Sequence, residues 1–264
     1  MPKTLLDALD SAARTSRGIT FHGPTPTRSS YAELRDAAAR MGTALAQRYQ
    51  AGRPVLVILP NGPGAVTAFF GALHAGLVPA MLNPPRPFGD DAIYVDGLVA
   101  VSRQADDAPI IAGPAVRALL AASPAARDLV LLDPDALDAE PDDARPHPVA
   151  LLQFTSGSLG HPKGVVLTHD AVLANAEGIS ERLGAGPDDI GCYWVPLAHD
   201  MGLIGSLVFL LSEGAEQVVM STEQFAIDPA PPGYRMLTLR ADGTLDTEVV
   251  RIDAAARMRA AAIA

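Results

Sequence analysis

The chain has 264 residues, 48% of them hydrophobic, which is enough for one large α/β domain or two small ones with a sizeable core. Its 30 acidic and 20 basic residues give a net charge of −10 without a long basic run, so we expect neither nucleic acid nor an anionic membrane surface as a partner. The single cysteine, Cys192, excludes an intrachain disulfide.

Two features that direct chains to membranes are missing from this sequence. Residues 1–16 lack the apolar core of a signal peptide. The longest strongly apolar run, residues 203–211, is far too short to cross a bilayer. We therefore expect a cytoplasmic protein.

The first strongly periodic segment, residues 30–49, predicts an amphipathic helix. Ser30 and Glu33 fit a capping box at its start. Five apolar residues form the stripe that this helix should bury: Tyr31, Leu34, Ala38, Met41 and Leu45.

Short β-branched runs and helical segments then alternate along the chain. We predict strands over 53–60, 77–82, 109–113 and 128–133, and helices over 62–76, 91–105 and 115–122. Strands that alternate with helices indicate an α/β fold, with a doubly wound, mostly parallel sheet and helices on both faces.

The second half of the chain divides at an acidic, proline-rich segment. We predict an N-terminal α/β subdomain over 1–132, a solvated linker over 133–148, a third region over 149–229, and a tail of different character over 230–264. Within the third part we expect strands at 149–154, 164–169 and 216–220, and helices at 170–183 and 200–214. The tail alternates apolar and polar residues around Ala241-Asp242-Gly243, which is typical of a β-hairpin.

The loop "QFTSGSLGHPKG", residues 153–164, has the composition of a phosphate cradle. Gly157 and Gly160 allow a positive φ, which turns backbone N–H groups toward an anion, and Lys163 supplies a fixed charge. Hydroxyl donors would come from Thr155, Ser156 and Ser158. On this chemistry alone a plain surface turn is an equal alternative.

Competing catalytic motifs fail on their spacing. In a Walker A loop a glycine precedes the lysine and a hydroxyl residue follows it, whereas here Pro162 precedes Lys163 and Gly164 follows. No G-x-S-x-G nucleophile elbow occurs. The six histidines show no metal-ligand spacing.

Two separated stretches resemble the adenylate-forming superfamily of acyl- and aryl-CoA synthetases, peptide-synthetase adenylation domains, luciferases and fatty acyl-AMP ligases. "FTSGSLGHPKGVVLTH" resembles its phosphate loop, and "WVPLAHDMGLIGSL", residues 194–207, resembles its Pro-Leu-x-His motif in the fatty acyl-AMP ligase version. "VVMSTEQFAIDP" continues the similarity, which covers residues 1–229. The resemblance implies the N-terminal portion of an adenylate-forming ligase fold. Residues 149–229 would then be its phosphate-loop and acyl-site region, and residues 230–264 a tail unrelated to the family.

The resemblance also implies a reaction, in which a carboxylate attacks the α-phosphorus of Mg-ATP to give an acyl-adenylate and pyrophosphate. ATP and Mg²⁺ would be the cofactors, a fatty or other carboxylic acid the substrate, and a carrier protein a possible acceptor. Lys163 and His199 would be catalytic, with His199 near the substrate carboxylate. The phosphates would be held by Thr155, Ser156, Gly157, Ser158, Gly160 and Lys163. The acyl site would comprise Trp194, His199, Met201 and Gly202.

The sequence departs from the family in two ways. Leu159 stands where the family usually has a hydroxyl residue. Family members are also roughly twice as long, and we find no match to their adenine-stacking aromatic, ribose-binding aspartate or C-terminal catalytic lysine. We therefore expect a shortened fatty acyl-AMP ligase-like protein that activates a carboxylic acid if complete or complemented. The alternative is a non-catalytic interaction or regulatory module with weak or no ATP binding.

Such a shortened domain exposes apolar surface, so we expect a homo-oligomer or a partner chain that supplies the missing half. Several side chains have a structural alternative. His199 would instead cap the helix that follows, together with Asp200, and Trp194 would fill the core. We expect His169 and His74 to be structural, and Cys192 to be an inert hydrophobe in a buried strand.

Overall fold

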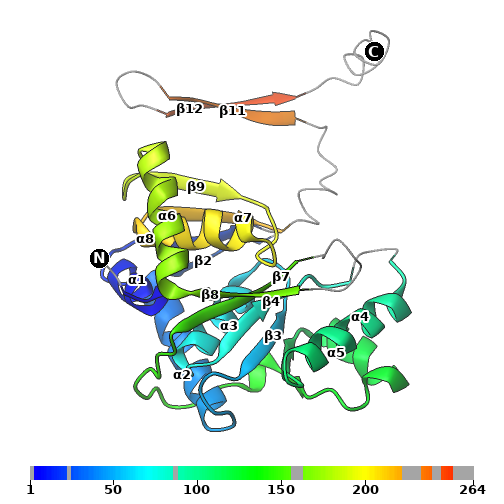
Figure 1. Ribbon diagram of the computed structural model, residues 1–264. Coiled ribbons are helices and arrows are strands. Elements are labelled where there is room, and N and C mark those ends of the chain that lie inside the picture. Colours follow the sequence, from blue (N-terminus) through cyan, green and yellow to red (C-terminus); the bar gives the residue numbers. More distant parts are fainter. Residues whose placement is uncertain are drawn as a thin grey trace, which may run out of the picture. The chain divides into compact units, whose positions relative to one another are not determined.

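One parallel sheet lies at the centre of the N-terminal half. The computed structural model describes residues 3–22, 25–85, 89–155 and 163–221, and the backbone of 233–239 and 245–251. Four parallel strands pair in the order β4-β3-β5-β6. Figure 1 shows β3 and β4 side by side. Their bounds are Pro54–Ile58 (β3), Val78–Met81 (β4), Ile110–Ala112 (β5) and Leu131–Leu132 (β6). All four strands were predicted from the sequence.

Both faces of this sheet are covered by helices. Alternate residues of β3 enter different cores: Val55 and Val57 pack with α3, whereas Leu56 and Ile58 pack with α4 and α5. All four are 0% exposed, as expected for a parallel strand between two helical layers. The helices span Pro63–His74 (α3), Asp91–Gln104 (α4) and Pro114–Ala121 (α5). The predicted doubly wound α/β architecture is confirmed.

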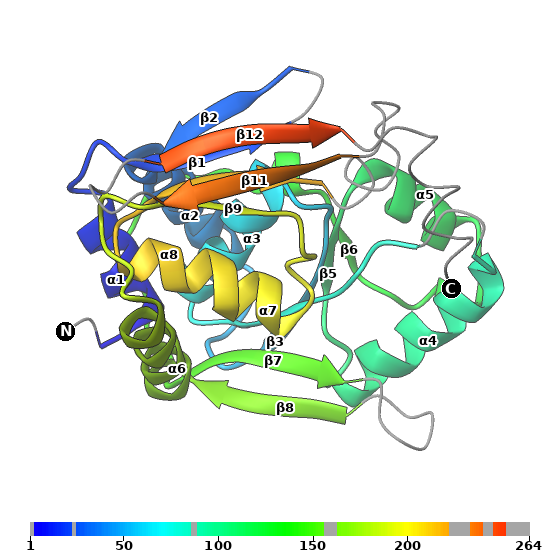
Figure 2. The same cartoon turned by 90° about the horizontal axis from the view of Figure 1, so that it is seen from above.

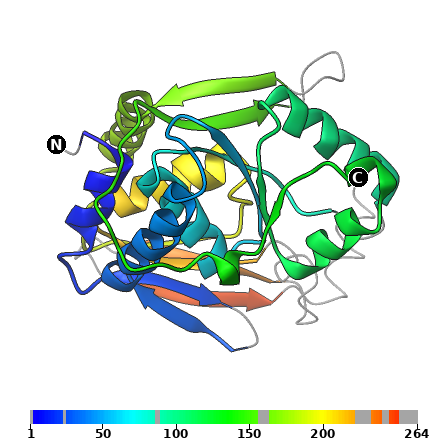
Figure 3. The ribbon, with the colours of Figure 1, turned by 90° about the horizontal axis from the view of Figure 1, so that it is seen from below.

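Helix α2, Tyr31–Ala46, begins at the predicted capping box. The Glu33 N–H donates to Ser30 Oγ at 3.1 Å, and the Ser30 N–H donates to Glu33 Oε2 at 2.8 Å. The Ser30 hydroxyl also donates to Glu33 Oε2, at 2.9 Å, and the two hydrogen bonds that Ser30 donates lower the pKa of the Glu33 carboxyl because they favour its charged form. All five residues of the predicted stripe are buried, and α2 lies beside α3 (Figure 3).

A second, mixed sheet has the order β2-β1-β10-β9, with β2 antiparallel and the other strands parallel. The strands span Gly18–His22 (β1), Thr27–Ser30 (β2), Ile190–Tyr193 (β9) and Glu216–Met220 (β10). We predicted β10 and a strand at Cys192, but missed β1, β2 and the N-terminal helix Leu5–Ala12 (α1), which are short. The expected burial of Cys192 is wrong, because its side chain is exposed at the edge strand β9.

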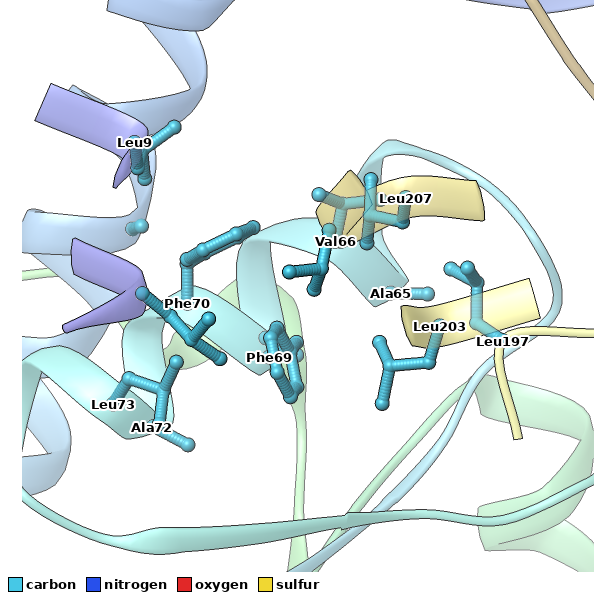
Figure 4. Packing of buried hydrophobic residues seen from close by; sticks show 14 of the residues in the cluster. Leu9, Ala65, Val66, Phe69, Phe70, Ala72, Leu73, Leu197, Leu203 and Leu207 are labelled. Carbon is cyan, nitrogen blue, oxygen red and sulfur yellow. The ribbon is translucent and has the colours of Figure 1, made fainter. Parts of the chain in front are cut away.

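Helix α3 anchors the segments that later form the candidate site. Phe69 and Phe70 are fully buried and meet edge to face, with ring centroids 5.2 Å apart. Figure 4 shows Leu197, Leu203 and Leu207 beside this helix in the same buried cluster. Residues near 200 are thereby fixed to the fold by apolar packing.

The segment 133–148, predicted to be a solvated linker, is held along α2 and α3. The Asp142 N–H donates to Thr43 Oγ1 at 3.0 Å, and the Arg145 N–H donates to the His74 carbonyl at 2.8 Å. His74 Nε2 in turn lies 2.9 Å from the Asp142 carbonyl. His74 therefore has the structural role that we expected, and most side chains of the segment are exposed.

The chain divides into two compact units, residues 1–222 and 223–264. The second contains the predicted hairpin, in which Gly233–Leu239 (β11) pairs antiparallel with Leu245–Arg251 (β12). Its predicted turn, Ala241-Asp242-Gly243, and residues 252–264 lie outside the described residues. The boundaries predicted at 132, 148 and 229 remain predictions. Among the helices that the structure describes, none is long and apolar enough to span a membrane.

Candidate functional site

Two antiparallel strands bring the ends of the glycine loop together. They span Val149–Thr155 (β7) and Lys163–Thr168 (β8), and Thr155 pairs directly with Lys163. The structure confirms that the loop joins two strands. Both paired side chains are exposed, so a hydroxyl and an ammonium group stand at one end of the ribbon. The other proposed phosphate ligands, Ser156, Gly157, Ser158 and Gly160, lie outside the described residues, as does Leu159.

An open groove of about 570 Å³ lies beside this ribbon. Its walls come from β7, β8, helix α6 (His169–Leu183) and the helical segment after His199 (Figure 2). That segment consists of α7 (Asp200–Gly202), the π-helix η3 (Leu203–Val208) and α8 (Phe209–Ser212). The lining residues are Gln153, Thr155, Val165, Leu167, Ala171, Val172, Asn175, Ile179, Asp200, Met201, Ile204 and Gly205.

The groove combines an apolar wall with a polar end. Val165 and Leu167 of β8 and Ile204 of the π-helix all line the groove. Thr155, at the end of the ribbon next to Lys163, lines it as well. Pockets of about 300–1,000 Å³ with apolar walls and a few polar groups are typical of small-molecule sites. The arrangement suits a ligand with an apolar tail and a polar head.

A side-chain amide joins the two sequence motifs. Gln153 of β7 donates through Nε2 to the carbonyl of Ala198 at 2.9 Å. Ala198 precedes His199, so this bond ties the strand before the glycine loop to the Pro-Leu-x-His motif. The motifs, which are far apart in the sequence, therefore border one groove.

Asn61, in the turn between β3 and α3, holds the same motif from the other side. Its Oδ1 accepts from the N–H of Leu197 at 3.0 Å, and its Nδ2 donates to the carbonyl of Val195 at 3.0 Å. A longer contact of 3.4 Å joins Nδ2 to the carbonyl of Met220 in β10. Both ends of one amide thus fix the backbone that precedes His199.

His199 occupies the N-cap position of α7, but its side chain makes no capping hydrogen bond. The imidazole therefore takes no part in the capping that we considered for His199 and Asp200. The Met201 N–H is instead bound by Asp200 Oδ1 at 2.8 Å. The imidazole is exposed and lies one residue from Asp200, which lines the groove.

The other predicted acyl-site residues are only partly brought together. Met201 lines the groove and is 65% exposed. Trp194 is 44% exposed, so the alternative that it fills the core is wrong; it does not line the groove in the described residues. Gly202 is buried, and a Cβ there would collide with the carbonyl of Pro196, which explains the need for glycine.

His169 is structural, as predicted. It is 6% exposed, its Nδ1 accepts from the N–H of Leu5 at 3.2 Å, and its Nε2 lies 3.1 Å from the carbonyl of His147. These partners require the neutral imidazole with its proton on Nε2. Burial lowers the pKa of His169 below its usual value, because desolvation penalises the charged form.

We did not identify Gln153, Asn61 or Asp200 from the sequence. Gln153 had a signal, since it is the one polar residue in the otherwise apolar run "VALLQF". Asn61 stands in "LPNGP" after a buried strand, where a turn is the ordinary interpretation. Its contacts with residues 195–220 depend on tertiary packing.

The described residues of this site are compatible with ATP and Mg²⁺. Thr155 and Lys163 place a donor and a cation at the same end of the ribbon, which suits phosphate oxygens. No cluster of three His, Cys, Asp or Glu side chains occurs in the described residues. Magnesium that binds together with ATP ordinarily takes several of its ligands from phosphate oxygens and water.

Comparison with known families matches residues 9–233 to the family described as AMP-binding enzyme. The chain belongs to this family. A putative acyl-CoA synthetase of Caulobacter vibrioides is 34% identical over 220 residues, which cover 79% of this chain and 38% of that protein. The long-chain-fatty-acid–AMP ligase FadD26 of Mycobacterium marinum is 31% identical over 194 residues, covering 68% and 32%.

Solved structures support the assignment of this chain to the AMP-binding enzyme family. One from a study of fatty acyl-adenylate ligases of E. coli and L. pneumophila superposes with a TM-score of 0.79 at 31% identity, covering 87% of this chain and 43% of that one. An adenylation domain of a keto acid-selecting NRPS module superposes with a TM-score of 0.78 at 24% identity, which shows the fold alone. The chain spans less than half the length of these relatives, from 32% to 43%.

Proposed function

We propose that this chain binds a fatty or other carboxylic acid together with ATP, and that it forms an acyl-adenylate when the family's remaining parts are present. One observation supports this proposal above the others. The strand that leads into the glycine loop and the helix that follows His199 line the same apolar groove. A carboxylate bound there would lie near the end of the ribbon where phosphates would be held.

In this proposal the phosphate loop holds the β- and γ-phosphates of ATP. Lys163 supplies the fixed charge, and Thr155, Ser156, Gly157, Ser158 and Gly160 supply hydroxyl and backbone N–H donors. Donors at this place would stabilise the negative charge that develops on the leaving pyrophosphate in the transition state. Mg²⁺ held together with the phosphates would offset part of their negative charge.

His199 is proposed to orient the substrate carboxylate. The backbone before it is held by Asn61 and Gln153, so its position is fixed while its side chain stays accessible. Met201 forms part of the acyl groove, and Gly202 keeps the turn tight. Trp194 is assigned to the rim of the site. Preorganised groups of this kind lower the barrier because they need not rearrange during the reaction.

The acceptor of the acyl group is a further part of the proposal. The relative JamA of Moorena producens is described as a medium-chain-fatty-acid–[acyl-carrier-protein] ligase and is 30% identical over 243 residues. A carrier protein is therefore the acceptor that we propose for the complete enzyme. A partner chain that supplies the missing half, or a second copy of this chain, completes the proposal.

Filling the groove tests the acyl part of the proposal. A Cβ at Gly205 would meet only the Asp200 carbonyl and Met201 Cγ, both at 3.9 Å, so Gly205→Leu fits the backbone and enters the groove. We expect it to reduce fatty-acid binding at least tenfold in isothermal titration, with pyrophosphate binding unchanged. Gly97→Leu on α4, where a Cβ meets nothing within 4 Å, is the matched control.

Equal fatty-acid affinity in the Gly205→Leu and Gly97→Leu variants would contradict the acyl assignment. If the unsubstituted chain binds neither fatty acid nor pyrophosphate, the non-catalytic interaction module becomes the better description.

A further inference from the structure

The groove wall contributed by η3 is a π-helix over six residues, Leu203–Val208. Ile204 and Gly205 line the groove, whereas Leu203 and Leu207 are buried against α3. A π-turn holds one residue more than an α-turn, and such turns are rare and usually local. Each residue of an α-helix advances about 100° around the helix axis. If η3 changed from π to α geometry, Ile204 and Gly205 would therefore rotate about this axis relative to the buried Leu207.

Gln217 lies behind this wall, in the centre of the second sheet. Its strand β10 pairs with β1 and β9, and its side chain is 0% exposed. The amide Nε2 donates to the carbonyl of Leu207 at 3.2 Å. A buried side chain of the sheet therefore binds the backbone of the π-helix directly.

The remaining hydrogen bonds of Gln217 fix the orientation of its amide. Its Oε1 accepts from the Tyr193 hydroxyl at 2.8 Å, and its Nε2 also donates to the Tyr31 hydroxyl at 2.9 Å. The Tyr31 hydroxyl donates in turn to the carbonyl of Ala215 at 2.6 Å. Burial raises the pKa of both tyrosines, so both hydroxyls keep their protons.

We infer that Gln217 is a positioning residue that holds η3 in π geometry and thereby sets the width of the groove. The inference rests on the proposed function, because it concerns the acyl groove. Satisfied buried polar networks specify one arrangement, since any alternative leaves a desolvated donor or acceptor without a partner. Here the network has members on α2, β9, β10 and η3, and only its bond to Leu207 reaches the groove wall.

The test compares Gln217→Met with Tyr193→Phe. The first keeps the side-chain volume but removes the donor to Leu207; the second removes a hydrogen bond of the same network and leaves that donor in place. We expect both to lower the melting temperature. Only Gln217→Met should speed amide hydrogen exchange in residues 203–212, by about fivefold to tenfold, as expected from one lost hydrogen bond.

Fatty-acid binding supplies a second measurement. Isothermal titration with saturated acids of increasing length should show a shifted length preference in Gln217→Met and the original preference in Tyr193→Phe. Failure of the unsubstituted chain to bind any acid would contradict the proposed function, whereas hydrogen exchange would still decide the role of Gln217. Unchanged exchange in Gln217→Met, or equal acceleration in both variants, would overturn the inference.

Should Gln217→Met not fold, Gln217→Glu tests the same contact. A protonated Glu carboxyl can donate to Leu207, whereas an ionised one cannot. Intrinsic amide exchange itself accelerates with pH, so each rate is divided by the intrinsic rate at the same pH to give a protection factor. Relative to the unsubstituted chain at the same pH, the protection factors of residues 203–212 in Gln217→Glu are expected to fall as the pH rises. A ratio of protection factors that does not change with pH would also overturn the inference.

Discussion

Strands β3 and β8 have similar apolar sequences but very different surroundings. In β3, Leu56 and Val57 are 0% exposed, because helices cover both faces of its sheet. In β8, Val165 and Val166 are 44% and 58% exposed. The closed sheet gives the molecule its stability, whereas the open ribbon offers surface for another molecule. An apolar run in the sequence predicts a strand, but it does not tell whether the fold covers it.

Most of the large hydrophobic side chains that are exposed belong to one part of the chain, residues 165–201. Of the eight large hydrophobic side chains that are exposed in the described residues, two, Ile93 and Val130, lie elsewhere. The other six lie between residues 165 and 201: Val165, Val166, Leu183, Ile190, Trp194 and Met201. Concentrations of this kind indicate a ligand or protein interface.

The largest expected effect concerns acyl-adenylate formation by this chain alone. We expect the purified 264-residue chain to give no detectable acyl-adenylate with Mg-ATP and medium- or long-chain fatty acids. No residue of this chain matches the family's groups that hold adenine and ribose, and losses in positioning multiply in the rate. Pyrophosphate exchange across a panel of carboxylic acids measures this. Robust exchange would show that this chain supplies those groups in another way.

A pair of core and surface truncations measures the contrast in stability. Phe69→Ala removes a fully buried ring from α3 and should lower the free energy of unfolding by about 3–5 kcal/mol. Val166→Ala on the exposed face of β8 should change it by less than about 0.5 kcal/mol. Urea denaturation of both variants gives the values. A large loss in Val166→Ala would mean that β8 is covered in solution, for instance by a second copy of the chain.

Gly202 is a tightly packed position within residues 165–201, the part of the chain with the most exposed apolar side chains. A methyl group there would collide with the backbone of Pro196, so Gly202→Ala should destabilise the chain by about 1–3 kcal/mol. Gly205→Ala, three residues later, meets only ordinary contacts and serves as the control. Thermal unfolding distinguishes the two. Similar melting temperatures would show that the turn before His199 is loosely held.

The smallest expected effect concerns the pH dependence contributed by His169. Its folded-state pKa lies below the usual value of 6.5, so the unfolded chain takes up the proton first as the pH falls. Its contribution to stability is therefore complete above about pH 6.5 and is lost progressively below that value. His169→Gln can still accept and donate but does not titrate. We expect a shallower loss of melting temperature in this variant between about pH 7 and pH 5.5; parallel curves would contradict it.

Much of the fold follows from local patterns in the sequence. The Ser30–Glu33 capping box and the alternation of strands with helices predict the closed sheet correctly, because local preference and burial agree there. The exposure of Cys192 and Trp194 was not predictable in this way, since it depends on which strands and helices cover them. The sequence motifs suggest Lys163 and His199 as candidates, whereas Asn61 and Gln153 act through tertiary contacts that no local pattern shows.

Phosphate binding at the open end of the β7–β8 ribbon is the central claim, and Lys163 tests it most directly. Isothermal titration of pyrophosphate into the unsubstituted chain and into Lys163→Ala compares the two affinities, with Arg103→Ala on α4 as a control for the loss of one surface charge. We expect binding to the unsubstituted chain and to the control, and an affinity at least tenfold weaker in Lys163→Ala, because a fixed cation beside Thr155 is removed while the exposed position leaves the fold intact. Equal affinity in all three proteins would contradict the claim.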